Sequence, residues 1–217
     1  MRKGDFKMKK IALILFFLSS LCFAQNSESA SPEKERENLI KVCESISSNK
    51  ITKGEFKQNK LIKRMKREMA SSGTFIISAE DGILWQTEKP YYSSMAMTKS
   101  AIIQTNAKGK KSVLSANTNA TFEQFAKVLS SVFTGKADTL MENFEIEFIG
   151  SPDNWNINLV PKNTSVRNFV AEIEMAGKIS IDTMTIHEAN GDFIRYEFLN
   201  QTYPEKLSDE EKEFFAS

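Results

Sequence analysis

The sequence has very few of the residues on which catalysis and metal binding usually depend. Its 217 residues include two cysteines and one histidine, so they form no Cys/His cluster with the spacing of a zinc site. A Gly-x-Ser-x-Gly nucleophile motif and a glycine-rich phosphate loop are also absent. His187 falls on the polar side of a predicted strand beside Glu188, where a histidine is usually solvated. We therefore expect no enzymatic activity, no bound metal ion and no cofactor.

Two pairs of acidic residues are the remaining candidates for acid–base chemistry. Glu145 and Glu147 are separated by one residue, as are Glu172 and Glu174, and apolar residues alternate with them. This spacing follows from the two-residue period of a strand with one apolar face. We interpret both pairs as parts of a solvated sheet face rather than as catalytic dyads.

No apolar run in the sequence is long enough to cross a bilayer as a helix. The longest, Ile11 to Phe23, has about 13 residues, whereas about 20 are needed. It follows a basic segment, and small residues at the −3 and −1 positions suit cleavage after Ala24. The pattern predicts a signal peptide over residues 1–24, starting at Met1 or at Met8, and therefore export.

The predicted signal peptide sets the expected domain boundaries. Residues 25–31 are small and polar and are predicted to form a flexible linker, and residues 32–217 are predicted to form a single domain. A competing interpretation makes Cys22 a lipid-modified N-terminus, although the preceding Leu21 is larger than the small residue such sites prefer.

The charge balance argues against nucleic-acid binding. The whole chain has a net charge of +1, and loss of the signal peptide removes five cations and one anion, which leaves about −3. One segment, Lys60 to Arg67 (KLIKRMKR), is strongly basic. It could contact anionic lipid or an acidic partner, or form a solvated ribbon. Cys43 would be the one cysteine left, and its place on an apolar helical stripe predicts a buried, unreactive thiol.

Two segments have the apolar periodicity of amphipathic helices. The first begins at Ser31-Pro32-Glu33, which suits an N-cap and first turn, and continues to Ser48. The second runs from Thr121 to Phe133, and Gly135 follows in the position that commonly ends a helix. Each has a wide apolar stripe, so each is expected to cover an apolar surface. The acidic residues 208–217 predict a short further helix.

Most of the remaining sequence alternates between apolar and polar residues with the period of β-strands. Two antiparallel strands are predicted between Gly73 and Pro90, and Asn190-Gly191 is a strong hairpin signal. One face of a later strand is predicted to carry Phe169, Ala171, Ile173 and Met175. The pattern predicts an α+β protein with one curved sheet of about ten or eleven antiparallel strands. One sheet face should be apolar and covered by the helices, and the other should be polar.

Several short motifs, in this order, resemble those of the LolA-type outer-membrane lipoprotein carriers of bacteria. They are Phe56-x-Gln58, Gly73-x-Phe75-x-Ile77, Leu84-Trp85 with Pro90, Asn154-Trp155-x-Ile157-x-Leu159-x-Pro161-Lys162, Gly177-Lys178-Ile179, Asn190-Gly191-Asp192 and Phe198-x-Asn200. The resemblance implies an incomplete (half) β-barrel whose helices form a lid over an apolar cavity. It further implies a periplasmic carrier that takes acylated lipoproteins from an inner-membrane lipoprotein-releasing transporter to a receptor or to the outer membrane.

On this resemblance, large apolar side chains of the sheet and of the second helix are candidates for contact with acyl chains, although each could instead be ordinary core. They are Phe75, Ile77, Trp85, Met95, Met97, Phe122, Phe125, Leu129, Phe133, Phe144 and Phe148. Met141, Met175 and Met184 also suit such a cavity, because a flexible thioether adapts to disordered chains.

The sequence departs from the family pattern at one turn. Many members carry an Arg-Pro pair before the tryptophan, and its arginine bonds to the lid. The corresponding residues 78–82 contain neither arginine nor proline, so we assign that role to no residue. We expect a monomer without nucleic-acid partners. The alternative function is that of a lipoprotein receptor, or another lipid-binding envelope protein, held on a membrane by acylated Cys22.

Overall fold

The protein is described here by a computed structural model that covers residues 31–115 and 130–216. The predicted signal peptide and nearly all of the predicted linker lie outside the described residues. Most of the predicted second helix also lies outside them, and with it the candidate residues Phe122, Phe125 and Leu129.

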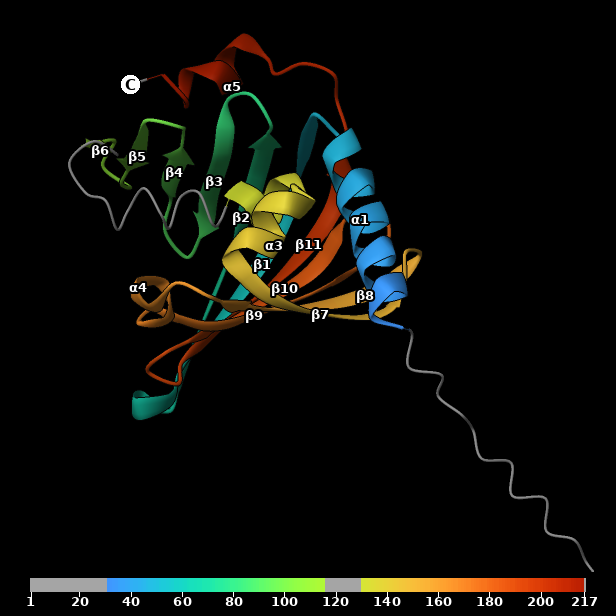
Figure 1. Ribbon diagram of the computed structural model, residues 1–217. Helices are drawn as coiled ribbons and strands as arrows, with labels where there is room; N and C mark the ends of the chain where they lie inside the picture. The colour runs from blue at the N-terminus through green and yellow to red at the C-terminus, as the bar shows by residue number, and fades with distance from the viewer. Residues whose placement is uncertain (1–30, 116–129, 217) are drawn as a thin grey trace, which may run out of the picture.

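In the described part of the chain, eleven strands form one open antiparallel sheet (Figure 1). The strands are β1 (Ile51–Ile62), β2 (Arg67–Ser78), β3 (Gly82–Lys89), β4 (Ser93–Met97), β5 (Ala101–Thr105), β6 (Lys111–Ser115), β7 (Phe144–Ser151), β8 (Asn154–Pro161), β9 (Val170–Gly177), β10 (Ile181–Glu188) and β11 (Phe193–Thr202). The strand order is β6-β5-β4-β3-β2-β1-β11-β10-β9-β8-β7. The predicted half-barrel of antiparallel strands is therefore confirmed.

Two meanders meet in the middle of the sheet. Strands β1 to β6 follow one another outward to one edge, and strands β11 back to β7 follow one another outward to the other. The join is the antiparallel pair of β1 and β11, in which Phe56 lies opposite Phe198. Within the described residues the edges β6 and β7 do not pair with each other, so the barrel stays open.

Helical segments pack within the curve of the sheet and at its ends (Figure 1). They are α1 (Pro32–Ser48), η1 (Lys63–Met65), α3 (Ala137–Asn143), α4 (Thr164–Arg167) and α5 (Asp209–Glu213), together with the helical residues 130–134. Ser31 caps α1 by accepting a hydrogen bond from the backbone N–H of Lys34, and Pro32 occupies the first turn, as predicted. Helix α1 contacts both β7 and α3.

Gly135 ends the helical segment 130–134, as predicted, with a φ of +61°. This left-handed conformation favours glycine. A Cβ atom at this position would also lie 2.6 Å from the carbonyl oxygen of Cys43 in α1. The absence of a side chain therefore lets the end of this segment approach the backbone of α1 closely.

The main hydrophobic core lies between the helices and the inner, concave face of the sheet. Leu39, Val42 and Cys43 of α1 pack in this core with side chains from both meanders, including the fully buried Phe144 and Trp155. Burial raises the pKa of the Cys43 thiol to about 12, and the charge of Glu44 adds to the rise. The expected buried thiol is thus present in the core.

The outer face of the first meander is not simply polar, contrary to expectation. A second cluster contains Ile76, Leu84 and Ile103, whose side chains point away from the main core. Leu207, Phe214 and Phe215, from the segment around α5, cover it. Figure 1 shows α5 at the end of the sheet formed by strands β3 to β5. Strands β3 to β5 thus have apolar side chains on both faces. The helices cover the inner face, and the segment around α5 covers the outer face.

The predicted pair of antiparallel strands between Gly73 and Pro90 is present as β2 and β3, and the stretch from Phe56 to Pro90 also contains the end of β1. The basic segment does not separate the Phe56 motif from the sheet, because β1 continues to Ile62 and pairs with β2 along its whole length, as far as Arg67. Polar and charged residues are compatible with these strand ends because residues 67–70 of β2 are exposed and residues 57–62 of β1 are exposed or half-buried.

Candidate functional site

A cavity of about 470 Å³ opens on the inner face of the sheet. Its apolar wall includes Ile83 and Trp85 from β3, Met97 from β4 and Phe133 from the helical segment. The other meander contributes side chains from β10 and β11, namely Met184, Ile186 and Tyr196. The cavity therefore lies across the join between the two halves of the sheet.

Neutral polar side chains line one end of the cavity, where the pairing of β3 with β4 finishes at Thr87 and Ser93. Gln58 of β1, Thr87 of β3 and Gln104 of β5 belong to this polar rim. Among the described residues that line the cavity, none carries a charged side chain. Burial raises the pKa of Tyr196 to about 12, with a further contribution from Glu188, so its phenol is neutral at physiological pH. The cavity thus suits an uncharged apolar group with a polar end.

Trp85 organises the aromatic wall of the cavity. Its indole lies 4.6 Å from the ring of Phe56 and 5.2 Å from that of Tyr196, measured between ring centroids. The rings of Phe75, Phe133 and Phe198 lie within 5.8, 6.3 and 5.9 Å of it. Trp85 remains only half-buried. Part of the indole is therefore held in place by aromatic neighbours, and the rest forms part of the cavity wall.

The structure separates the candidate residues into groups. Trp85, Met95, Met97 and Phe133 line the cavity. Phe75 and Ile77 lie beside a much smaller void of about 20 Å³ that Phe133 also borders. Binding of a ligand by any of these residues remains a prediction.

Two candidates lie in the core rather than at the cavity. Phe144 and Phe148 of β7 are buried in the main cluster with α1 and α3, and they are not among the described residues that line the cavity. Of the three further methionines, Met184 lines the cavity, whereas Met175 and Met141 belong to the core.

The candidate list did not include Ile83, Ile186, Tyr196 or the polar rim. A signal was present for Ile83 and Ile186, because each lies on the apolar side of a strand with two-residue alternation. No comparable signal existed for Gln58 or Gln104. A polar residue on an otherwise apolar face becomes recognisable as part of a rim only when the distant strands are brought together.

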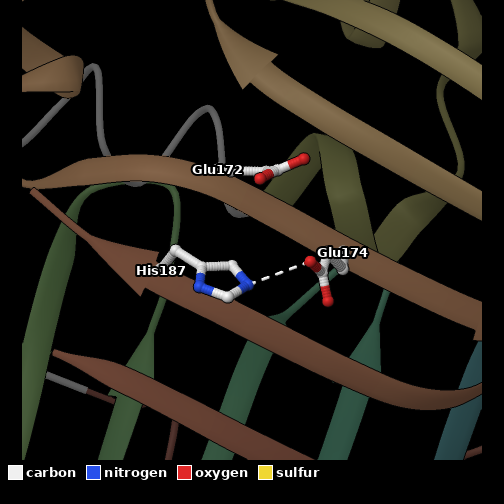
Figure 2. A group of neighbouring side chains, drawn as sticks. All are labelled: Glu172, Glu174 and His187. Carbon is white, nitrogen blue, oxygen red and sulfur yellow. Dashed lines mark ion pairs between the residues drawn. The ribbon is translucent and has the colours of Figure 1, made fainter. Parts of the chain in front are cut away.

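A separate group of polar side chains lies on the outer face of β9 and β10 (Figure 2). His187 lies directly opposite Glu172 in the strand pairing, and its Nε2 atom is 3.0 Å from Oε1 of Glu174. The three residues offer ligand atoms within 4.8 Å of one another, a donor set that a divalent cation accepts. His187 is thus in contact with a carboxylate, whereas the sequence had suggested a merely solvated side chain.

This outer group is separate from the cavity. The neighbouring Ile173 and Ile186 point to the inner face, where Ile173 is buried in the core and Ile186 lines the cavity. The side chains of His187 and Glu174 are 37% and 49% exposed. The pair is an ion pair only when the imidazole is protonated.

The turn that lacks an Arg-Pro pair is held by its own side chains. Ser78 Oγ donates a hydrogen bond to Oδ2 of Asp81 at 2.6 Å and accepts one from the Asp81 backbone N–H at 3.0 Å. Gly82 completes the turn with a φ of +123°. Both hydrogen bonds therefore lie within the turn and stabilise its conformation locally.

Other residues of the motifs have clear structural roles. Trp155 is buried and donates a hydrogen bond from Nε1 to the carbonyl oxygen of Lys178 at 2.8 Å. Gly177 lies against this indole, since a Cβ atom there would be 2.7 Å from Cζ2 of Trp155. The motif that contains Trp155 and the motif Gly177-Lys178-Ile179 are therefore in contact. The indole of Trp155 in β8 packs against the turn between β9 and β10.

Comparisons with solved structures give distant likenesses. A protein of the DUF1329 family from Desulfovibrio piger is 10% identical, with a TM-score of 0.47, and the match covers 83% of this chain and 96% of that one. A LolA superfamily protein from Nitrosomonas europaea is 9% identical, with a TM-score of 0.46 and coverage of 84% and 97%. The lipoprotein LppX from Mycobacterium tuberculosis is 7% identical, with a TM-score of 0.40 and coverage of 82% and 100%. No curated protein sequence matches the chain.

The helices of the described residues include none that is both long and apolar enough to span a membrane. A family model described as "Outer membrane lipoprotein carrier protein LolA" matches residues 47–214. The match extends from the end of α1 to the residue after α5 and so includes all eleven described strands. The resemblance seen in the motifs is confirmed: the chain belongs to the LolA family of outer membrane lipoprotein carrier proteins.

Proposed function

We propose that this protein binds the acyl chains of lipoproteins in its inner cavity and carries them from the inner to the outer membrane. The observation that carries the proposal is an uncharged cavity of about 470 Å³ in a member of this family. Its size lies within the range of roughly 300–1,000 Å³ typical of ligand sites. Each methylene moved from water into such a site gains about 0.8 kcal/mol, so binding needs no covalent step.

The chemistry of the cavity suits reversible binding. The thioethers of Met95, Met97 and Met184 can adapt to a flexible chain, because unbranched side chains change rotamer at low cost. The half-buried indole of Trp85 offers a flat apolar surface. The neutral amides of the polar rim can meet the ester or peptide end of the cargo without requiring a charge there.

The proposed route requires export. We propose that residues 1–24 are removed as a signal peptide and that residues 32–217 form a single periplasmic domain that acts as a monomer. An inner-membrane lipoprotein-releasing transporter would supply the cargo, and a receptor or the outer membrane itself would accept it. Mass spectrometry of the mature protein tests the first step. A free N-terminus at Gln25 supports a soluble carrier, whereas an acylated Cys22 would instead make the protein membrane-anchored.

An uptake experiment tests the binding step. Delipidated protein is mixed with membranes that contain a triacylated lipoprotein, and the lipoprotein recovered in soluble complex is measured. Ile186→Glu places a carboxylate at the cavity wall, where desolvation of the charge opposes the entry of an acyl chain, so uptake should be lost. Ile149→Glu makes the same change at an isoleucine of β7 that is 50% exposed, and it should leave uptake unchanged.

Circular dichroism and an unfolding curve establish that both variants are folded before uptake is compared. Equal uptake by Ile186→Glu and Ile149→Glu would contradict binding in this cavity. Failure of the unsubstituted protein to take up any lipoprotein would contradict the carrier function itself.

A further inference from the structure

The hairpin of β1 and β2 extends beyond the body of the sheet. The two strands pair as far as Ile62 and Arg67, whereas pairing of β2 with β3 ends at Ser72 and Lys89. Helix η1 and Lys66, which has a left-handed φ of 48°, form the connection. Figure 1 shows this end projecting away from α1, α3 and α5. We call residues 63–67 the basic tip.

The positive charge of the basic tip is not neutralised by nearby carboxylates. Lys63, Arg64, Lys66 and Arg67 lie within five residues, and all are exposed. Among the ion pairs of the described residues, none involves these four side chains. Glu68 follows directly in the sequence, so the local excess remains strongly positive.

Two acidic side chains beside the tip are already engaged. Glu188 forms an ion pair with Lys60 at 2.7 Å. Asp192 is 9% exposed and accepts a hydrogen bond from the backbone N–H of Lys63 at 2.9 Å. The turn between β10 and β11 therefore supports the backbone of the tip while leaving the four cations available to a partner.

An apolar side chain stands at the centre of these cations. Met65 is 59% exposed, with Arg64 and Lys66 on either side, and Met69 in β2 is 41% exposed. Exposed apolar groups among lysines and arginines are characteristic of elements that lie in the headgroup region of an anionic membrane. The cations meet lipid phosphates, while the apolar side chain reaches the boundary with the acyl chains.

The size and shape of the tip favour a lipid surface over an acidic protein. A specific protein interface usually buries more than about 1,000 Å² in total, and five residues at the end of a hairpin offer little of that. A bilayer requires no matching shape, because its charge is diffuse and its headgroups are mobile. We propose that the basic tip docks on an anionic lipid bilayer, with Met65 inserted among the headgroups.

The docking site is close to the polar end of the cavity. Gln58, which belongs to the polar rim, lies on β1 five residues before Lys63. At about 3.4 Å per residue along a strand, the rim and the start of the tip are separated by roughly 17 Å. Docking would therefore hold the polar end of the cavity near the membrane surface, where a lipid-linked group enters or leaves.

A fluorescent probe on the tip tests this contact. In a Cys22→Ser background, an environment-sensitive fluorophore is attached through Met65→Cys, because the thiol of Cys43 is buried. Vesicles of mixed phosphatidylglycerol and phosphatidylcholine should shift its emission to the blue as the probe leaves water. The same probe attached through Lys108→Cys, in the exposed turn between β5 and β6, should not shift. Any contact of the N-terminal segment with lipid affects both labelled proteins equally.

The charge requirement is tested with the same probe. Each cation near an anionic surface strengthens binding about fivefold, so Arg64→Gln with Arg67→Gln should weaken vesicle binding by about 30-fold. Lys108→Gln with Lys110→Gln, an equal loss of charge in another exposed turn, should have little effect. Added salt should weaken binding by the unsubstituted tip more than by the Arg64/Arg67 variant.

Three outcomes would overturn the proposal. They are a tip probe that remains in water, equal binding to pure phosphatidylcholine vesicles, and full affinity after loss of both arginines. Retention on a polyglutamate matrix without vesicle binding would instead assign the tip to an acidic protein. The measurement requires no cargo, and Ile186→Glu should bind vesicles normally, so failure of docking and failure of the proposed carrier function can be distinguished.

Discussion

The ring of Phe56 lies 4.6 Å from the indole of Trp85 although their strands, β1 and β3, are separated by β2. The contact crosses β2 beside Gly73, which pairs with Phe56 on one side and with Thr87 on the other. A Cβ atom at Gly73 would collide with the backbone of β3 at Gln86, so the lack of a side chain lets β2 and β3 stay paired beside this contact. The strand pairing that places Trp85 in the aromatic wall therefore depends on this glycine.

We predict that Gly73→Ala destabilises the fold by more than about 2 kcal/mol. A Cβ atom at this position would lie 1.9 Å from the carbonyl oxygen of Gln86, so β2 and β3 would have to separate. The change is measured as the midpoint of urea unfolding, followed by tryptophan fluorescence. Ser72→Ala, one residue earlier in β2, is the control and should cost little. Similar midpoints for the two variants would show that β2 tolerates the extra atom.

A second prediction concerns the contact of the helical segment 130–134 with α1. Gly135→Ala introduces strain at a φ of +61° and places Cβ 2.6 Å from the carbonyl oxygen of Cys43. We expect a loss of roughly 1–3 kcal/mol in the free energy of unfolding. Lys136→Ala, at the next position and exposed, should be nearly neutral by the same measurement. An unfolding midpoint unchanged by Gly135→Ala would disprove the close packing of this segment against α1.

The thiol of Cys43 should be protected in the folded protein. Burial raises its pKa to about 12, and the thiolate is the reactive form. In a Cys22→Ser variant we expect almost no reaction with a disulfide reagent at about pH 8, and full reaction after denaturation. Rapid reaction without denaturant would show that α1 opens readily from the core. Gly135→Ala should increase the rate in native buffer, because it loosens the contact beside Cys43.

The ion pair between Lys53 and Glu211 should make the attachment of α5 depend on pH. Their charged atoms are 2.5 Å apart. Burial opposes ionisation of Glu211, but hydrogen bonds from Lys53 and Ser208 outweigh it and hold the pKa of Glu211 below its ordinary value. The contribution to stability is therefore present above the pKa of the unfolded state and is lost as pH falls through the lower pKa of the folded state.

We expect Glu211→Gln to lower stability by up to about 1 kcal/mol at neutral pH, because the pair is partly exposed to solvent. The difference from the unsubstituted protein should shrink as the pH falls below the unfolded-state pKa, and it should disappear once Glu211 is also protonated in the folded state. Urea unfolding at several pH values measures it. Glu210→Gln is the matched control, since Glu210 is exposed and has no ion pair among the described residues. A pH-independent effect of Glu211→Gln would mean that the carboxylate charge is not responsible.

The alternation of apolar and polar residues was enough to predict the general architecture. It gave the wrong face for a residue where the pairing between strands is irregular. Phe169 was expected to share a face with Ile173 and Met175, yet it is 62% exposed and Val170 is buried instead. The pairing of β9 with β10 shifts register between His187 and Glu188, beside Val170. A shift of one residue exchanges the faces of a strand, and the local sequence contains no sign of it.

The cavity was harder to predict than the core. Trp85 and Met97 have the same sequence pattern as Phe148, since all three are large apolar residues on the inner side of a strand. Phe148 and Met97 are both buried in the main core, but only Met97 also borders the cavity, together with the half-buried Trp85. Whether a residue lies in the core or at the cavity depends on how distant strands and helices pack. The alternation of apolar and polar residues shows only which face of the strand a side chain occupies.

The central pairing of β1 with β11 has a consequence for how the chain acquires its structure. Phe56 and Phe198 face each other there, and ten of the eleven described strands precede β11 in the sequence. Each meander can form from neighbouring hairpins, but their junction must close a loop of well over a hundred residues. The first meander therefore has no partner for its inner edge until β11 has been synthesised. A growing chain therefore lacks a complete cavity until it contains Tyr196 and the rest of that strand.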